Sequence, residues 1–422
     1  MTVEPSLPES PASSFKPRLP RVFRHRNYRL FYAGQMVTLI GTWVQSVALS
    51  WLVYRLTHSP FLLGVVSFAS QAPIFFVTPF AGMVADRSDR RRVFMTTRAL
   101  ALVQAAILSV MTLTDNIEIN TIIVLALALG IITAVEVPAR QSFTVDMVGR
   151  EDLRQAIAFN AMMFNFTRTV GPALGGIIVA TIGEGLCFFL NTISSGAVLI
   201  SLFMMRLERR APRPTSRPWD DLKQGFVYVT RHPHIRMILF LSTVCSCFGT
   251  SYLALMPAFA QDVLHQGADG LGYIIGAFGA GAVAGAALVS RLHERHLKLL
   301  PTIMAVLLGV SLVLFANAHS LALALILVVP TGFAYLAIAV SSNTQVQLLS
   351  EDAMLGRVMA FYAMGALGSP PLGALLLGYV ADRVGVPNAF MLSGALCLIA
   401  AGISLGSLRR RGMIGFAGKS AG

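Results

Sequence analysis

The chain has 422 residues, of which 55% are hydrophobic and only 13% are charged, and its mean hydropathy is +0.68. An ordinary soluble domain carries about 25% charged residues, so this composition excludes a water-soluble globular protein. The formal net charge of +13 could by itself suit a nucleic-acid partner.

Residues 1–20 are rich in Pro and Ser and lack the apolar segment of a secretory signal, so we expect a disordered tail and no cleaved signal peptide. Behind this tail, apolar residues come in blocks of about 20, the length of helix that spans a hydrocarbon core of ~30 Å. The sequence therefore predicts an all-α integral membrane protein. We expect twelve membrane-spanning helices, at 30–54, 61–85, 93–113, 121–142, 155–181, 185–205, 236–261, 270–290, 299–316, 321–345, 356–379 and 387–407.

On this map nearly all Lys and Arg residues fall on one side of the membrane, and the opposite connections hold only Arg55 and Arg383. Such asymmetry follows the positive-inside rule and predicts that both termini lie in the cytoplasm. The same charges would attract anionic lipid headgroups. Membrane topology thus explains the basic composition, and we expect no nucleic-acid partner.

The four cysteines lie in or beside predicted spans. Cys245 and Cys247 have the spacing of a metal pair, but no cluster of His or Cys stands near them in the sequence. We therefore expect them to pack as small apolar residues, and we expect no metal and no other cofactor.

The longest polar interval, residues 206–235, divides the chain into two sets of six spans. Within it Trp219, Leu222, Phe226 and Val229 recur at helical spacing, which predicts an amphipathic helix on the cytoplasmic membrane surface. A plain connector with one helical turn is the alternative. We expect a tail at 1–20, a six-helix bundle at 21–205, a linker at 206–235, a second bundle at 236–407 and a tail at 408–422.

The two sets of spans resemble each other at an offset of about 200 residues. GREDLRQAIAFN (149–160) resembles LSEDAMLGRVMAFY (349–362), and GPALGG (171–176) resembles SPPLGA (369–374). Spans five and eleven are therefore copies. A duplicated six-helix unit is typical of transporters with alternating access, whose substrate sites lie between the repeats.

The stretch GMVADRSDRRR (82–92) forms the short connection between spans two and three. It resembles the Gly-x-x-x-Asp-Arg-x-Gly-Arg-Arg pattern that the major facilitator superfamily carries there, with matches at Gly82, Asp86, Arg87, Arg90 and Arg91. Asp89 stands where the general pattern has Gly, and this form resembles the subset that contains the enterobactin exporter and related transmembrane secretion effectors. The resemblance covers essentially the whole chain and implies twelve helices in two pseudo-symmetric bundles.

The resemblance also implies a gating latch at this connection. Asp86 is expected against the positive N-terminal end of span eleven, and the arginines are expected to pair with carboxylates across the cytoplasmic seam. Such contacts would form when the cytoplasmic side closes and break when it opens. The alternative is that the arginines merely anchor the topology.

The stretch TRTVGPALGG (167–176) on span five resembles the Gly-Pro-x-x-Gly-Gly element of the superfamily's drug–proton antiporters. The matches are Gly171, Pro172, Gly175 and Gly176, and Thr167 replaces the upstream glycine of the fuller pattern. Pro172 is expected to bend the helix, and the glycines permit close packing against a neighbour. The resemblance implies export rather than uptake; small-residue packing with no role in direction is the alternative.

Charged residues inside the predicted spans of the first bundle include Glu136, Arg140 and Arg168. Each is expected to face a cavity or a partner, because an ionised side chain at the bilayer centre costs about 2.5–3.5 kcal/mol. Glu136 is a candidate proton carrier, since an apolar environment favours the protonated carboxyl group. Alternatively, Glu136 and Arg140 neutralise each other one helical turn apart. Arg168 is a candidate contact for an anionic substrate group or a member of a structural ion pair.

The resemblance implies that spans one, four, seven and ten line a central cavity. Seven polar or aromatic residues are candidate substrate contacts, although each could instead form an interhelical hydrogen bond: Gln35, Gln45, Asn160, Asn165, Tyr252, Tyr335 and Asn343. The sequence has no Walker A, Rossmann or HExxH motif, which argues against an ATP-driven pump or a metalloprotease.

These features predict a monomeric, proton-linked efflux transporter for a small amphipathic drug, siderophore or metabolite in a bacterial cytoplasmic membrane. We expect no enzymatic activity. An uptake symporter or a lipid flippase on the same fold is the nearest alternative. A membrane-embedded lipid enzyme, with His232 and His234 as its closest approach to a catalytic cluster, and a non-transporting receptor are more distant alternatives.

Overall fold

The structure is a computed structural model that describes residues 20–87, 89–149, 151–205, 218–293, 297–351 and 354–410. Within these ranges the side chains at 75, 78–87, 90, 142, 145–146, 165, 218–222 and 410 are not described. All regular structure in the described ranges is helical, which confirms the predicted all-α fold.

The N-terminal half comprises η1 (Arg21–Arg24), α1 (Arg26–Thr57), α2 (Pro60–Arg87), α3 (Arg90–Leu113), α4 (Ile119–Val148) and α5 (Leu153–Met204). The C-terminal half comprises α6 (Pro218–Arg231), α7 (Pro233–Cys247), η2 (Ser251–Leu255), α8 (Met256–Ala258), η3 (Phe259–Val263), α9 (Ala268–Arg291), α11 (Leu300–Ala316), α12 (Leu321–Leu349), α13 (Leu355–Gly368), α14 (Pro370–Val384) and α15 (Val386–Arg410).

These helices account for the twelve predicted spans. α5 contains spans five and six, and the chain changes direction at Gly183, whose φ of 79° is readily adopted only by a residue without a Cβ atom. Span seven is the run from α7 to η3. Span eleven is α13 followed by α14, and it breaks at Pro370 because proline cannot donate the backbone hydrogen bond of a continuous helix.

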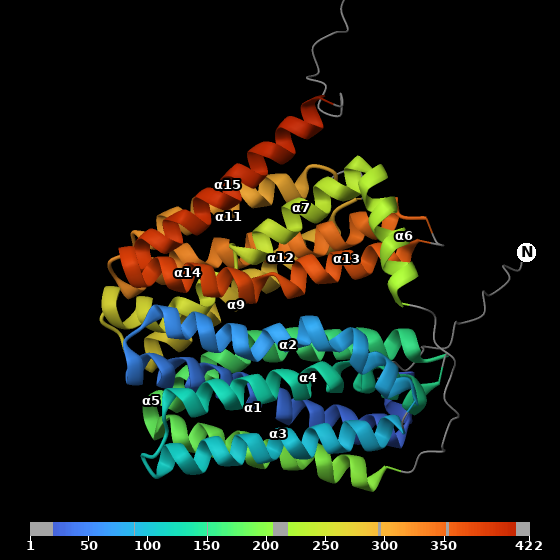
Figure 1. The fold of residues 1–422 in the computed structure, drawn as a ribbon, viewed down its shortest axis with the longest axis vertical. Coiled ribbons are helices and arrows are strands. Elements are labelled where there is room, and N and C mark those ends of the chain that lie inside the picture. The colour runs from blue at the N-terminus through green and yellow to red at the C-terminus, as the bar shows by residue number, and fades with distance from the viewer. Residues whose placement is uncertain are drawn as a thin grey trace, which may run out of the picture.

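The two halves form separate bundles that meet along two pairs of helices (Figure 1). α1 packs against α5 within the N-terminal half and α9 packs against α12 within the C-terminal half, whereas α2 packs against α14 and α5 against α9 between the halves. We call the end of the bundles with η1, the α2–α3 connection and α6 the basic face. The end with the connection from α1 to α2 and that from η3 to α9 is the opposite face.

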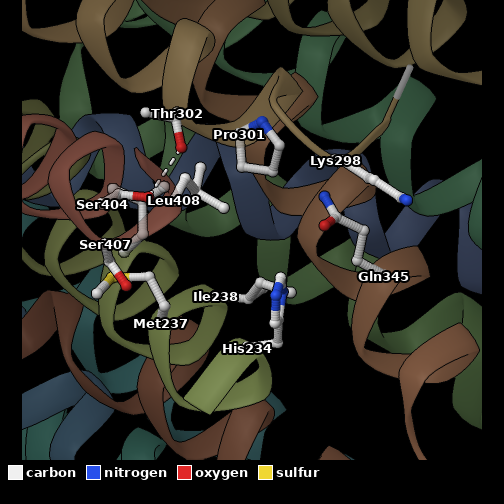
Figure 2. A pocket seen from close by; sticks show the side chains of 11 residues that line it. His234, Met237, Ile238, Lys298, Pro301, Thr302, Gln345, Ser404, Ser407 and Leu408 are labelled. Carbon is white, nitrogen blue, oxygen red and sulfur yellow. Dashed lines mark hydrogen bonds between the residues drawn. The ribbon is translucent and has the colours of Figure 1, made fainter. Parts of the chain in front are cut away.

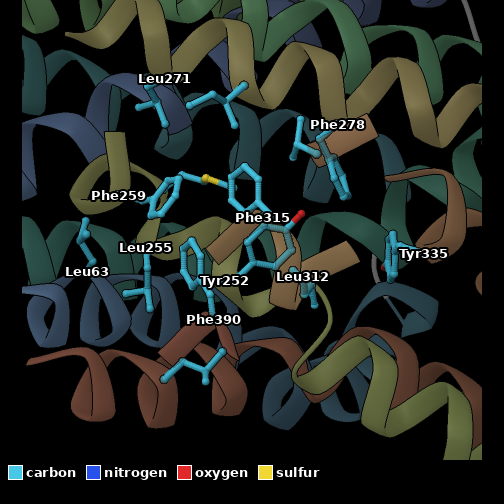
Figure 3. Close-up of a cluster of buried hydrophobic side chains, with 14 of the residues drawn as sticks. Leu63, Tyr252, Leu255, Phe259, Leu271, Phe278, Leu312, Phe315, Tyr335 and Phe390 are labelled. Carbon is cyan, nitrogen blue, oxygen red and sulfur yellow. The ribbon is translucent and has the colours of Figure 1, made fainter. Parts of the chain in front are cut away.

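A cluster of aromatic side chains fills the C-terminal bundle (Figure 3). Tyr252, Phe259, Phe315 and Phe390 are fully or almost fully buried, with ring centroids 4.9–6.1 Å apart. The Tyr252 hydroxyl lies 2.8 Å from Oγ1 of Thr331, so its polar atom is satisfied inside this apolar core. The cluster holds the broken span seven in place against its neighbours.

The linker contains the expected helix, α6, which lies across the basic face of the C-terminal half (Figure 1). Tyr228 and Val229 are buried in a cluster with residues of α7, α12 and α13, and Gly225 packs against Phe361. Phe226 remains 59% exposed. The helix therefore docks on α13 with one face while Phe226 points away from the protein core.

Candidate functional site

A cavity of about 420 Å³ lies between the two halves. Its walls come from α1, α2 and α5 on one side and from η2, α9, α12, α13 and α14 on the other. Most of the lining is apolar; Trp43, Phe164 and Leu367 contribute large side chains, while several serines and Gln71 contribute polar ones. Cavities of this size hold drug-sized molecules, and a site shared by both halves can change its access when the halves rotate.

Arg168 of α5 brings a positive charge into this cavity. Its Cζ atom lies 5.6 Å from the ring centroid of Tyr335 on α12, which is a cation–π contact between the two halves. Tyr335 is only 9% exposed and its ring stacks on that of Phe278 (Figure 3). Two residues that the sequence proposed separately, one as an ionic group and one as a substrate contact, therefore meet in the cavity wall.

The halves close the cavity at the opposite face. Ser59 Oγ donates a hydrogen bond to Asp382 Oδ1 at 3.0 Å, and the Tyr54 hydroxyl donates to the Asp262 carboxylate. Both hydrogen bonds join the N-terminal half to the C-terminal half. A methyl group on Gly64 would lie 2.6 Å from the carbonyl oxygen of Ala374, so α2 and α14 touch through their backbones.

The glycines of the span-five motif have different partners. Gly171 and Gly175 face α1, where Trp43 and Val44 pack against them, and Pro172 lines the cavity. Gly176 instead contacts Gly272 of α9 in the other half. The motif therefore combines packing within one bundle with a close approach of the two bundles at the opposite face.

The carboxylate of Glu136 pairs with Arg98 of α3, at 2.5 Å between Oε1 and Nη2, and both side chains are 8% exposed. Arg98 also stacks over the ring of Phe94, 5.6 Å from its centroid. Arg140, which the sequence offered as the partner, lies near this pair as a second positive charge. The sequence analysis did not single out Arg98, although it lies within the predicted span 93–113 and its charge inside an apolar span was the available signal.

Gln35 lies at the same depth as this ion pair. Phe31 of α1 packs against Phe94 of α3, with 6.3 Å between the ring centroids, and the two helices run in the same direction. Gln35 lies one helical turn after Phe31, and Arg98 lies one turn after Phe94. Gln35 is 1% exposed, and among the described residues neither of its amide atoms has a hydrogen-bond partner. Nε of Arg98 likewise lacks one there. Buried polar groups of this kind are normally satisfied by ordered water.

Among the predicted latch residues, the structure describes the side chain of Arg91. The side chains of Gly82, Asp86, Arg87 and Arg90 lie outside the described residues, so their predicted contacts are not placed. Arg91 donates from Nη2 to the carbonyl oxygen of Leu202 at 2.6 Å, at the C-terminal end of α5 in its own half. Among the described residues the hydrogen bonds of its side chain go to α5 of its own half, and its contact across the seam stays a prediction.

Asp89, the departure from the general superfamily pattern, is the N-cap of α3. Its Oδ1 atom accepts from the backbone amides of Arg91 and Arg92 at 3.0 and 3.3 Å. These amides belong to the first turn of the helix, whose N–H groups have no partner within it. The Asp in place of Gly thus stabilises the start of span three.

The other proposed substrate contacts lie mostly away from the cavity. Gln45 accepts a hydrogen bond from Asn191 at 2.5 Å inside the N-terminal bundle, and Asn160 accepts one from the Tyr28 hydroxyl at 3.0 Å. Asn343 accepts one from Gln347 at 2.5 Å on its own helix, α12. Tyr252 is part of the buried aromatic cluster, and the side chain of Asn165 is not described. Of the six candidates whose side chains the structure describes, Tyr335 is the one that lines the cavity.

Comparison with known proteins identifies the family. The sequence matches the family model described as "Transmembrane secretion effector" over residues 13–412. The chain belongs to this family of the major facilitator superfamily. The predicted resemblance is therefore confirmed, and the chain is a multi-pass membrane transporter rather than an enzyme.

Two bacterial transporters are relatives of this secretion effector family member. The chain is 27% identical to the staphyloferrin A transporter of Staphylococcus aureus, over 87% of this chain and 92% of that protein. It is 24% identical to the enterobactin exporter EntS of Shigella boydii, over 84% of this chain and 85% of EntS. In fold it is similar to a solved bacterial homologue of the human lysosomal transporter Spinster in an inward-facing, unoccupied conformation. The TM-score is 0.71 and the identity 13%, over 92% of this chain and 98% of the homologue.

A second hollow of this transporter is too small for a transported molecule. It measures about 20 Å³ and lies at the basic face of the C-terminal half. Figure 2 shows Thr302 hydrogen-bonded to Ser404 on one side of this hollow and Gln345 and Lys298 on the other. A volume of this size holds one water molecule. Within the described ranges, no group of three or more His, Cys, Asp or Glu residues could hold a metal ion, and Cys245 and Cys247 are free thiols.

Proposed function

We propose that this family member exports a small amphipathic molecule across a bacterial cytoplasmic membrane in exchange for protons. The observation that carries the proposal is the cavity between the halves, which contacts between the halves close at one face. Alternating access requires both features: a site built by two bodies, and a closure that a relative rotation of those bodies can undo. The relative EntS is an enterobactin exporter, which supports export as the direction of transport.

The orientation follows from the distribution of positive charge. If the basic face lies in the cytoplasm, as the positive-inside rule predicts, the contacts from Tyr54 to Asp262 and from Ser59 to Asp382 form an outer gate. The described conformation is then closed to the outside. Arg91 bound to α5 of its own half fits a state in which the inner latch is released.

Proton coupling is assigned to Glu136. A proton on its carboxyl group would remove the negative member of the pair with Arg98 and leave two neighbouring cations, Arg98 and Arg140, without compensation. The two protonation states then prefer different arrangements of α3 and α4, which is how a bound proton biases a conformational equilibrium. Gln35, without a protein partner at this depth among the described residues, marks a place where water could reach the pair.

Efflux measurements on intact cells test this proposal. Cells that express wild-type protein, Glu136→Gln or Glu118→Gln are loaded with carboxyfluorescein or with ethidium, and the loss of dye is followed with and without a protonophore. Glu118 is an exposed carboxylate near the start of α4, so its substitution is the matched control. We expect export of at least one dye by wild type and Glu118→Gln, and its loss with the protonophore or in Glu136→Gln.

The other outcomes separate the parts of the proposal. Protonophore-sensitive export that survives in Glu136→Gln retains the antiporter and removes Glu136 as its proton carrier. Export of neither dye above that of cells without the protein counts against efflux. Dye accumulation that depends on the protein would instead support the uptake symporter.

A further inference from the structure

The charge of the cavity restricts what it can bind. Among the described residues that line it, Arg168 is the charged one, and no carboxylate stands in the wall. Among the described residues, no Asp or Glu forms a salt bridge with Arg168. A guanidinium group cannot lose its charge at physiological pH, so this part of the cavity remains positive across the physiological pH range. A positive site favours an anionic ligand and disfavours a cationic one, because opposite charges attract and like charges repel.

The position of the guanidinium group suits recognition of a carboxylate. Its contact with Tyr335 is through the face of the ring, at 5.6 Å, and the ring is fixed by its stacking on Phe278. A guanidinium stacked on an aromatic ring keeps its N–H donors at the edge, where a carboxylate binds in a bidentate manner. Arg168 and Tyr335 both line the cavity, so the contact places the guanidinium group in its wall.

The remainder of the wall suits an apolar body attached to that anionic group. Trp43 and Phe164 stand next to each other, 6.3 Å between ring centroids, and both line the cavity on the same half as Arg168. Ser67, Ser70 and Gln71 of α2 add neutral hydrogen-bonding groups. A volume of about 420 Å³ accommodates a drug-sized molecule.

We propose that the transported molecule is a drug-sized organic anion with an aromatic or other apolar body, and that its carboxylate binds Arg168. This inference rests on the proposed transport function and names the substrate class of the same cavity. Arg168 belongs to the N-terminal half and Tyr335 to the C-terminal half, so a carboxylate that draws the guanidinium away from the ring weakens a contact between the halves. Binding of the substrate would in this way favour their separation.

Two xanthene dyes of similar skeleton and opposite charge test the substrate class. Carboxyfluorescein is an anion and rhodamine 6G is a cation, and their binding to purified full-length protein in lipid nanodiscs is measured by fluorescence anisotropy without any proton gradient. Wild type is expected to bind carboxyfluorescein more tightly. Arg168→Gln should weaken that binding at least tenfold and leave rhodamine 6G binding equal or stronger, and Arg168→Lys should fall between the two.

Arg383→Gln is the matched control. Arg383 also lies over an aromatic ring, 4.4 Å from the centroid of Tyr379, but stands outside the cavity. Its substitution should leave both affinities unchanged. Retained rhodamine 6G binding shows that a variant is folded. If Arg168→Gln does not fold, Tyr335→Leu serves as a second variant: it keeps the charge of Arg168 and should therefore retain the preference for carboxyfluorescein.

Carboxyfluorescein binding by wild type that is no tighter than that of rhodamine 6G, including no binding at all, overturns the inference. An equal loss of carboxyfluorescein binding in Arg383→Gln would also overturn it. Because no transport is measured, either result leaves proton-linked efflux standing, and the efflux experiment on cells decides that question separately.

Discussion

The contact of Gly176 on α5 with Gly272 on α9 provides a direct test of the closure at the opposite face. A methyl group on Gly176 would lie 2.6 Å from both the carbonyl oxygen of Ala268 and the amide nitrogen of Gly272. Non-bonded heavy atoms are optimally about 3.5–4.0 Å apart, so α5 and α9 would have to separate by about 1 Å. Overpacking of this kind costs about 1–3 kcal/mol.

The cost in Gly176→Ala applies only to the conformation in which the two helices touch. A difference of about 1–3 kcal/mol shifts a two-state equilibrium about 5- to 150-fold, here toward the conformation that is open at the opposite face. Gly402→Ala is the control, because a Cβ atom at Gly402 on α15 meets no heavy atom within 4 Å. Both substitutions change helix propensity in the same way.

Cross-linking of a cysteine pair reports the closure. Ser59 and Asp382 are replaced by cysteine, since their side chains lie within 3.0 Å across the seam, and the initial rate of reaction with a short thiol cross-linker is measured in membranes. We expect a rate at least about fivefold lower with Gly176→Ala and an unchanged rate with Gly402→Ala. An unchanged rate with Gly176→Ala, or an equal decrease with the control, would refute the reasoning.

Three further predictions concern single contacts. Arg98→Met should destabilise the protein by about 3–5 kcal/mol, because it leaves the Glu136 carboxylate buried without its partner. The double substitution of Arg98 and Glu136 by Met should cost less than the sum of the two single substitutions. Thermal unfolding in detergent measures these losses, and additive losses would contradict the prediction. Asp89→Ala should cost about 1 kcal/mol through loss of the α3 cap, whereas Asp89→Ser should stay near wild type, and equal unfolding temperatures for both would argue against the cap. Tyr54→Phe should slow the cross-linking of the cysteines at positions 59 and 382 several-fold, because a hydrogen bond to the Asp262 carboxylate contributes about 1.5–3 kcal/mol to closure. A rate equal to that without Tyr54→Phe would show that Tyr54 does not contribute to the gate.

The sequence by itself determined the class of fold and the family. Apolar blocks about as long as a bilayer is thick identify membrane helices whatever their tertiary neighbours, because backbone polar groups in lipid must be satisfied within each helix. The predicted boundary between spans five and six, 181–185, contains Gly183, where the chain turns, whereas the break at Pro370 falls inside the predicted span 356–379. The motif at 82–92 indicated the family that the match over residues 13–412 then confirmed.

Only the tertiary structure decided which polar residues meet. The spacing of Glu136 and Arg140 suggested a pair on one helix, but Glu136 contacts Arg98 on another helix, which no local pattern encodes. Gln45 and Tyr252 were candidates for the cavity and instead satisfy partners inside their own bundles. The sequence shows which residues within a span are polar. The rotation of each helix against its neighbours decides whether such a residue faces the cavity, a partner or the core.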